Sequence, residues 1–109
     1  MRNEILYPFV PVPAGTKNLA VTTTTARVAI TALSGVGRMQ ARIYNAGSVP
    51  VFVEVGDVTV VAVVASGMPI APGATELITV PDAAGVARYV AGITASGTAT
   101  LYITPGEGL

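Results

Sequence analysis

The chain contains no cysteine, no histidine and no tryptophan, and Lys17 is its only lysine. The absence of thiol and imidazole groups excludes the usual nucleophile–base pairs of enzymes and the usual zinc ligands. Charged residues make up 11% of the chain, less than half of the about 25% in an average soluble domain. The sequence consists instead of short alternating runs of Val, Thr, Ala, Gly and Pro, which favour strands and turns. This composition indicates a protein that acts through its surface.

The acidic residues do not form a catalytic or metal-binding pattern. Asp57 and Asp82 lie in predicted turns, where aspartate is favoured because its side chain bonds to the backbone. Glu54 and Glu76 fall on predicted outward faces of strands. A calcium loop needs several acidic residues close together, and this sequence offers no such group. We therefore expect no enzymatic activity, no metal ion and no cofactor.

The size and charge of the chain limit its partners. With 109 residues and a mass of 11.0 kDa it has the size of one domain. Its formal net charge of zero favours neither nucleic acid nor an anionic membrane as a partner. The longest apolar stretch, residues 58–65, is much shorter than the about 18 residues of a membrane-spanning helix. We expect neither nucleic acid nor a membrane as a partner.

Few charges on a small, apolar chain predict exposed apolar surface. The mean hydropathy is +0.65, and a monomer of this size has much surface for its few charged side chains to cover. Large exposed apolar patches usually mark contacts with other molecules, so we expect the protein to work inside an assembly. The alternative is a monomer whose strands are coated with Thr and Ala.

The first 13 residues, MRNEILYPFVPVP, differ from the rest of the chain. Three prolines disfavour a helix and a central strand, and apolar residues lie between them. We predict an extended arm over residues 1–13 that docks on its own domain or on a neighbouring subunit. An edge strand of the same domain is the alternative.

Residues 14–109 are predicted to form a single all-β domain, an antiparallel β-sandwich of about eight strands. Residues 38–45 show a clear alternation, with Met39, Ala41 and Ile43 facing inward. No stretch of ten residues or more has a convincing helical period. Further strands are expected at 18–26, 27–33 and 75–80, turns at 34–37, 72–73 and 82–85, and a flexible exit at 105–109.

Two hairpins are predicted where turn residues separate apolar runs. In residues 51–63, a two-residue turn at Gly56 and Asp57 places five valines on one face, namely those at 51, 53, 55, 58 and 60. In residues 89–104, a three-residue loop at 95–97 gives Gly97 a left-handed position. The second register places Tyr89, Ala91, Ile93, Ala99, Leu101 and Ile103 on one face, and Val90, Gly92, Thr94, Thr98, Thr100 and Tyr102 on the other.

Parts of the sequence resemble small virion proteins of tailed bacteriophages, in particular capsid decoration (cement) proteins. The resemblance is carried by RIYNAGSVPVFVEVGD at 42–57, MPIAPGATELITV at 68–80 and ITASGTATLYITPGEGL at 93–109. It spans roughly residues 17–109 and does not include the N-terminal arm. It implies a jelly-roll or related β-sandwich that forms a dimer or trimer on the outer capsid lattice, with no catalytic residue to carry over.

We therefore expect a structural virion protein, made in the host cytoplasm, that stabilises the capsid surface by bridging subunits of the major capsid protein. Arginine suits interface contacts better than lysine because its planar group forms paired hydrogen bonds, and tyrosine is also enriched in interfaces. The expected contact residues are Tyr7, Phe9, Val10, Arg42, Tyr44, Arg88 and Tyr102.

Two other virion functions stay open. A head fibre, tail or spike module could recognise a host glycan or protein through the outward Thr and Tyr residues of the 98–104 strand. A head–tail connector component would instead sit at one vertex of the particle.

Overall fold

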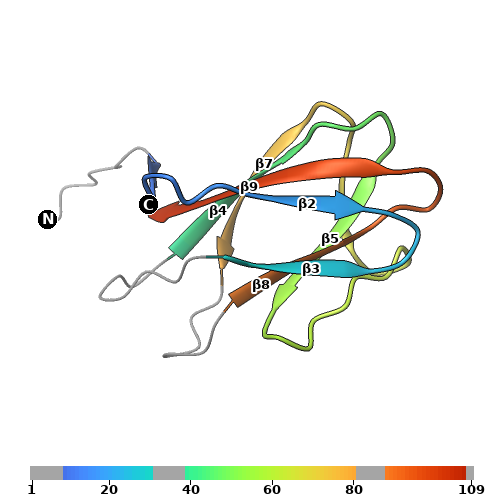
Figure 1. Ribbon diagram of the computed structural model, residues 1–109, viewed down its shortest axis with the longest axis horizontal. Helices are drawn as coiled ribbons and strands as arrows, with labels where there is room; N and C mark the ends of the chain where they lie inside the picture. Colours follow the sequence, from blue (N-terminus) through green and yellow to red (C-terminus); the bar gives the residue numbers. More distant parts are fainter. Residues whose placement is uncertain (1–8, 31–38, 81–87, 108–109) are drawn as a thin grey trace, which may run out of the picture.

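The computed structural model describes residues 9–30, 39–80 and 88–107. Within these ranges the chain forms two antiparallel sheets and no helix, so the predicted all-β sandwich is confirmed (Figure 1). The described segments also contain no helix long and apolar enough to cross a membrane. The strands are β1 Val10–Pro11, β2 Lys17–Val21, β3 Ala26–Ile30, β4 Met39–Asn45, β5 Val51–Gly56, β6 Met68–Ile70, β7 Thr75–Val80, β8 Arg88–Ile93 and β9 Ala99–Glu107.

The strand pairing is nested. In the five-stranded sheet β9 pairs with β4 on one side and with both β1 and β2 on the other, and β4 continues to β7. In the four-stranded sheet the order is β3-β8-β5-β6. The pairs β2–β9, β3–β8, β4–β7 and β5–β6 therefore enclose one another. This is the pairing of one long hairpin, folded into two layers by the contacts of β4 with β9 and of β5 with β8.

The core lies between the two sheets and follows the period of two that a strand imposes. Met39, Ala41 and Ile43 of β4 are buried, as predicted, and the residues between them are exposed or half-buried. Burial of a side chain of the size of Met39 or Ile43 stabilises the fold by about 1.5–3 kcal/mol. The other fully buried aliphatic side chains of high volume are Val21, Val51, Val53, Ile70, Val90, Leu101 and Ile103.

One buried polar residue ties the two sheets together at the end of β4. Asn45 is fully buried, and its Nδ2 donates hydrogen bonds to the carbonyl oxygens of Val49 and Ile70, both at 2.9 Å. Its Oδ1 accepts a hydrogen bond from the Gly47 amide at 2.9 Å. Because Ile70 belongs to β6 of the opposite sheet, this side chain joins β4 to both the following turn and the other layer.

The predicted hairpin over residues 51–63 is wrong. β5 does end at Gly56, but it pairs with β6 and β8, and residues 57–67 form an irregular connection. Val58, predicted to face inward, is 52% exposed. The turn signal and the valine spacing are local, whereas the partner of β5 comes from residues further along the chain.

The predicted hairpin over residues 89–104 is also wrong, because β8 and β9 belong to different sheets. Their connection crosses between the two layers, with Gly97 at the predicted left-handed conformation, φ 76°. Val90, Gly92 and Thr94, predicted to face outward, are buried. Each strand alternates by itself, but the assumption of direct pairing assigned the faces of β8 incorrectly.

The other local predictions have mixed outcomes. The strand at 75–80 and the turn at 72–73, where Gly73 has φ 76°, are confirmed. The single strand predicted at 18–26 is divided, because residues 22–25 turn the chain from β2 into β3. The flexible exit predicted at 105–109 is wrong for residues 105–107, which complete β9. The predicted turns at 34–37 and 82–85 lie outside the described residues.

The described part of the N-terminal arm pairs with its own domain. Val10 and Pro11 lie opposite Glu107 and Gly106, and the Val12 amide donates a hydrogen bond to the Pro105 carbonyl at 2.9 Å. β1 and β2 thus occupy successive stretches of the same side of β9. Between them the chain makes a tight turn, in which the Gly15 amide donates to the Val12 carbonyl at 3.0 Å.

Candidate functional site

The outer face of the five-stranded sheet carries most of the predicted contact residues that the structure describes. Residues of β4, β7 and β9 that point away from the core alternate with the buried ones. They place Arg42, Tyr44, Leu77 and Tyr102 on one surface, and Phe9 lies against it. We call these five residues the aromatic face.

Two tyrosines stand side by side on this face. Tyr44 of β4 lies directly opposite Tyr102 of β9, and their ring centroids are 6.4 Å apart with an angle of 26° between the ring planes. Both side chains remain substantially exposed, at 40% and 42%. Cross-strand aromatic pairs stabilise a sheet, but exposed aromatic rings held by rigid strands are also typical anchors of protein interfaces.

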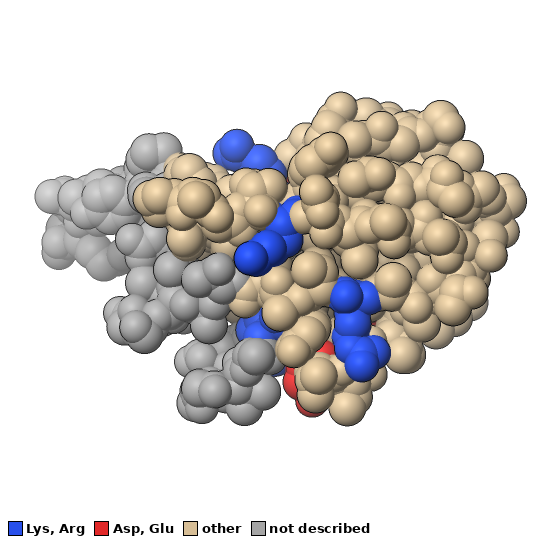
Figure 2. All heavy atoms as spheres, in the orientation of Figure 1, with Lys and Arg blue, Asp and Glu red and all other residues tan. Residues whose placement is uncertain are grey.

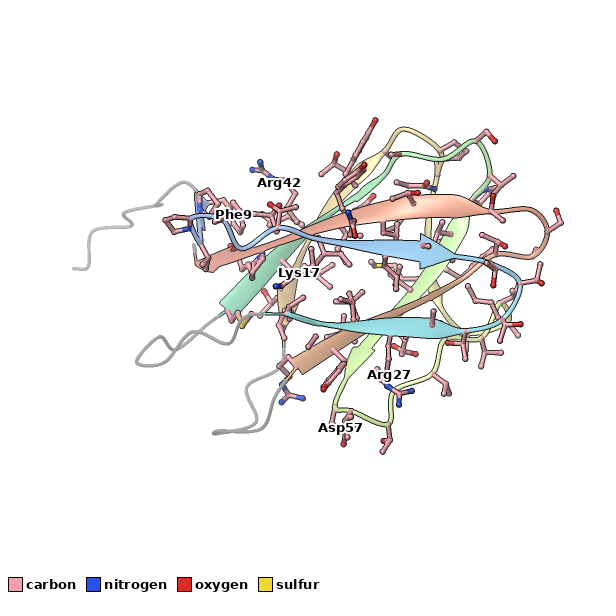
Figure 3. The ribbon with its side chains drawn as sticks, in the orientation of Figure 1. Phe9, Lys17, Arg27, Arg42 and Asp57 are labelled. Atoms are coloured by element: carbon pink, nitrogen blue, oxygen red, sulfur yellow. The ribbon has the colours of Figure 1, made fainter. Side chains whose placement is uncertain are left out.

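Arg42 lies at the centre of the aromatic face. In the register of the sheet it is opposite Thr104 of β9 on one side and Leu77 of β7 on the other. Its guanidinium carbon is 4.8 Å from the centroid of the Phe9 ring, a cation–π contact, as the labelled side chains in Figure 3 show. Leu77 is 47% exposed, so the charge lies beside the apolar side chains of Phe9 and Leu77.

At its described outward positions the aromatic face carries a positive charge and no negative one. At the described outward positions of β4, β7 and β9 the only charged side chain is that of Arg42, and the others are Thr, Gln, Tyr, Leu and Gly. In the view of Figure 2 positive groups are more visible than acidic ones. Such a surface suits a partner that brings apolar groups and an acceptor for the guanidinium, such as a carboxylate or a row of carbonyl oxygens.

An open groove of about 570 Å³ adjoins the aromatic face. Its lining includes Ala20 of β2, Thr100 of β9 and Ala46, which follows β4. The lining residues are small and uncharged, so the groove can fit a partner by its shape but has no charged group to bind a ligand. The groove can receive a projecting side chain or loop of a macromolecular partner, and nothing in it favours a small charged ligand.

Of the remaining predicted contact residues, only Arg88 has a described side chain, and it does not join the aromatic face. Tyr7 lies outside the described residues, and Val10 is placed through the backbone pairing of β1. Arg88 belongs to β8 in the opposite sheet and is half-buried. Its Nε atom is buried and forms no hydrogen bond with any described group. Arg88 is therefore separate from the contact surface built around Arg42 and Tyr44.

Two of the edge strands, β7 and β6, are poorly suited to pairing with a further strand. Glu76 of β7 occupies an inward register position opposite Ile43, not the predicted outward face, yet its side chain reaches solvent. A charge at an inward position of an edge strand discourages pairing with another chain. On β6, the edge of the other sheet, Pro69 has no amide hydrogen to offer. Contacts through the faces and loops are thereby favoured.

The connection from β5 to β6 begins with a side-chain turn. Asp57 Oδ1 accepts hydrogen bonds from the Thr59 hydroxyl at 2.6 Å and from the Thr59 amide at 2.9 Å. These two bonds, the hydroxyl first, lower the pKa of Asp57 below its ordinary value of 3.8, with a smaller contribution from the positive charge of Arg88. The carboxylate therefore serves the turn, as the sequence predicted for this position.

Sequence reasoning missed two features of the exposed surface. Leu77 lies between Thr75 and Thr79 on the outward face of β7. The alternation of residues 75–80 could have predicted that its side chain is exposed. The valines of the β5–β6 connection were assigned to a hairpin face, so their exposure could not be predicted without the pairing of β5.

The described residues contain no cluster of three or more acidic, His or Cys side chains that could hold a metal ion. Comparison of the chain with protein-family models, with curated proteins and with solved structures finds no match.

Proposed function

We propose that this protein is a structural component of a tailed-phage virion that decorates the capsid and stabilises it by bridging subunits of the major capsid protein. The observation that carries the proposal is the aromatic face, a rigid exposed surface of Tyr44, Tyr102 and Leu77 around Arg42. The resemblance of residues 42–57, 68–80 and 93–109 to capsid decoration proteins supports the same function.

Binding energy alone can provide the proposed stabilisation. A protein that binds the assembled lattice, and not free subunits, shifts the equilibrium toward the lattice by mass action. Each contact can be weak, because a copy that touches two capsid subunits gains from the high effective concentration of its second site. Edge strands that resist pairing also suit a protein present in many copies, because they oppose uncontrolled strand addition.

We infer that the sandwich is a jelly roll. The nested pairs from β2–β9 inward to β5–β6, folded into two sheets, support this topology. Jelly rolls are frequent in viral capsid and lectin domains. A fold by itself does not imply a function, so this inference adds support only in combination with the aromatic face.

Capsids assembled with and without the protein test the proposed function. We expect capsids that carry the protein to survive a higher temperature or a stronger chelator than bare capsids. The double variant Tyr44→Ala/Tyr102→Ala should lose at least tenfold in affinity for the capsid, since exposed tyrosines at interface centres are frequent hot spots. Lys17→Gln, which removes a charge outside the aromatic face, should bind normally. Equal resistance of decorated and bare capsids would reject the stabilising role.

Glycan binding is a second candidate, favoured by the pair of exposed tyrosine rings with threonines of β9 beside them. Aromatic rings provide flat apolar surface, and neighbouring hydroxyls provide hydrogen bonds. Binding of the purified protein to a glycan array, without binding to capsids, would favour this function over decoration. A ring of fixed copy number at one vertex would indicate a connector component instead.

A further inference from the structure

The connection between β5 and β6 exposes a second apolar surface, separate from the aromatic face. Val58 and Val61 are each 52% exposed, Val63 is 49% exposed and Val64 is 37% exposed. We call these four residues the valine ridge. No charged residue occurs between Asp57 and Glu76. Exposed apolar residues that are this concentrated usually mark a contact with another molecule.

Contacts on the buried side of the β5–β6 connection fix the position of the valine ridge. Ala62, which lies between Val61 and Val63, is buried, and its amide donates a hydrogen bond to Thr25 Oγ1 at 2.8 Å. Val60 packs so closely on β5 that a Cβ built on Gly56 would lie 3.1 Å from the Val60 side chain. The Gly67 amide donates to the Val63 carbonyl at 2.7 Å and closes the far end. The exposed valines are therefore presented by a fixed backbone.

The charges around the ridge differ from those of the aromatic face because both signs are present. Arg27 of β3 and Glu54 of β5 both lie opposite Ala91 of β8, so they occupy one row across the outer face of the four-stranded sheet. Both side chains are exposed. Asp57, at the start of the ridge, lies in the same part of the molecule as Arg27 (Figure 3).

We propose that the valine ridge and its flanking charges form the surface through which two copies of this chain associate about a two-fold axis. A two-fold interface uses the same patch on both copies, so the patch must be complementary to itself. A rotation about an axis parallel to β8 places Arg27 of each copy against Glu54 of the other. The ridge of each copy then covers the ridge of the other.

The charge pattern favours a second copy over another partner. The aromatic face, with Arg42 and no acidic side chain at its described outward positions, would place like charges together in such a dimer. The ridge side offers one charge of each sign in one row. The benefit of such a dimer rests on the proposed function, because two linked copies bridge capsid subunits more strongly than one. A dimer would leave two aromatic faces free for the capsid.

The association of the purified full chain tests the proposal without any capsid. Sedimentation equilibrium over a range of concentrations should show a monomer–dimer equilibrium. Val61→Thr/Val63→Thr, which keeps side-chain shape and adds hydroxyls, should weaken the dimer at least tenfold. The matched control Leu77→Thr changes an equally exposed apolar residue of the aromatic face and should leave the dimer unchanged. Thermal unfolding of each variant checks that it is folded.

Charge exchange tests the two-fold arrangement itself. Arg27→Glu and Glu54→Arg should each weaken the dimer several-fold, and the double variant should restore it because each copy again offers opposite charges. A monomer at every concentration, or a dimer that ignores the valine changes, overturns the proposed interface. A double variant that is no better than the single ones overturns the two-fold pairing. Either failure leaves capsid binding through the aromatic face open, so the two proposals fail separately.

Discussion

The guanidinium carbon of Arg42 lies 4.8 Å from the centre of the Phe9 ring. This contact joins the residue before β1 to the middle strand of the aromatic face, beside the backbone pairing of Val10 and Pro11 with β9. The described end of the N-terminal arm therefore belongs to the same surface as Tyr44 and Tyr102. A partner that binds the aromatic face also meets the arm.

Phe9→Ala and Arg42→Gln should each lower the free energy of unfolding by about 0.5–1 kcal/mol, the usual range for an exposed cation–π pair. The losses should not add in the double variant, because both changes remove the same contact. Urea unfolding of the two single variants and the double variant measures the coupling. Arg27→Gln, at an exposed arginine of the other sheet, should show no coupling with Phe9→Ala. Strict additivity at Phe9 and Arg42 would show that the contact does not stabilise the fold.

Asn45→Ala should destabilise the protein by about 2–4 kcal/mol. The change removes hydrogen bonds to Val49, Ile70 and Gly47 and leaves buried backbone groups without partners. Asn18→Ala is the matched control, because Asn18 is exposed on β2 and should change stability by less than about 0.5 kcal/mol. Equal unfolding midpoints for the two variants would contradict the role assigned to Asn45.

Ala14→Gly should stabilise the protein slightly. Ala14 has φ 55° in the turn between β1 and β2, a left-handed conformation that costs a residue with a Cβ about 1–2 kcal/mol. Glycine removes this strain but adds about 0.5–1 kcal/mol of backbone entropy loss on folding. The net gain should be roughly 0.5 kcal/mol, whereas Ala20→Gly, in the neighbouring strand, should only destabilise. Thermal unfolding measures both, and a loss of stability in Ala14→Gly would contradict the strained turn.

Thr59→Ala should raise the pKa of Asp57 toward its ordinary value, because the threonine hydroxyl provides the strongest of the bonds that lower it. A carboxyl group with a lowered pKa stabilises the folded state above its ordinary pKa of 3.8. That contribution is lost as the pH falls through the lowered folded-state value. NMR titration of the Asp57 carboxyl measures the change, with Thr79→Ala as the control. An Asp57 pKa that is the same in both variants would refute the assignment.

The alternation of β4 could be predicted because it is a local property. One face of the strand is buried, so Met39, Ala41 and Ile43 reveal their side of the sheet without knowledge of the neighbouring strands. The same holds for the left-handed Gly97 and for the turn of Asp57 with Thr59. In each case the physical cause lies within a few residues.

Strand pairing could not be predicted in the same way. The turn signal at Gly56 and Asp57 is real, yet β5 pairs with β6 and β8, because pairing depends on which strands come together in the folded chain. For the same reason Val58 was expected in the core and is exposed. The aromatic face was predicted in part: Arg42, Tyr44 and Tyr102 lie together, but Arg88 is in the other sheet.

We propose that the aromatic face binds a capsid lattice. The most direct measurement is the number of copies of this chain bound to each purified particle, from quantitative gels, for the natural chain and for Tyr44→Ala/Tyr102→Ala. Lattice binding predicts on the order of hundreds of copies for the natural chain, as the repeated symmetry of a capsid requires, and a large loss for the variant. About a dozen copies or fewer, or equal occupancy by the two chains, would contradict it.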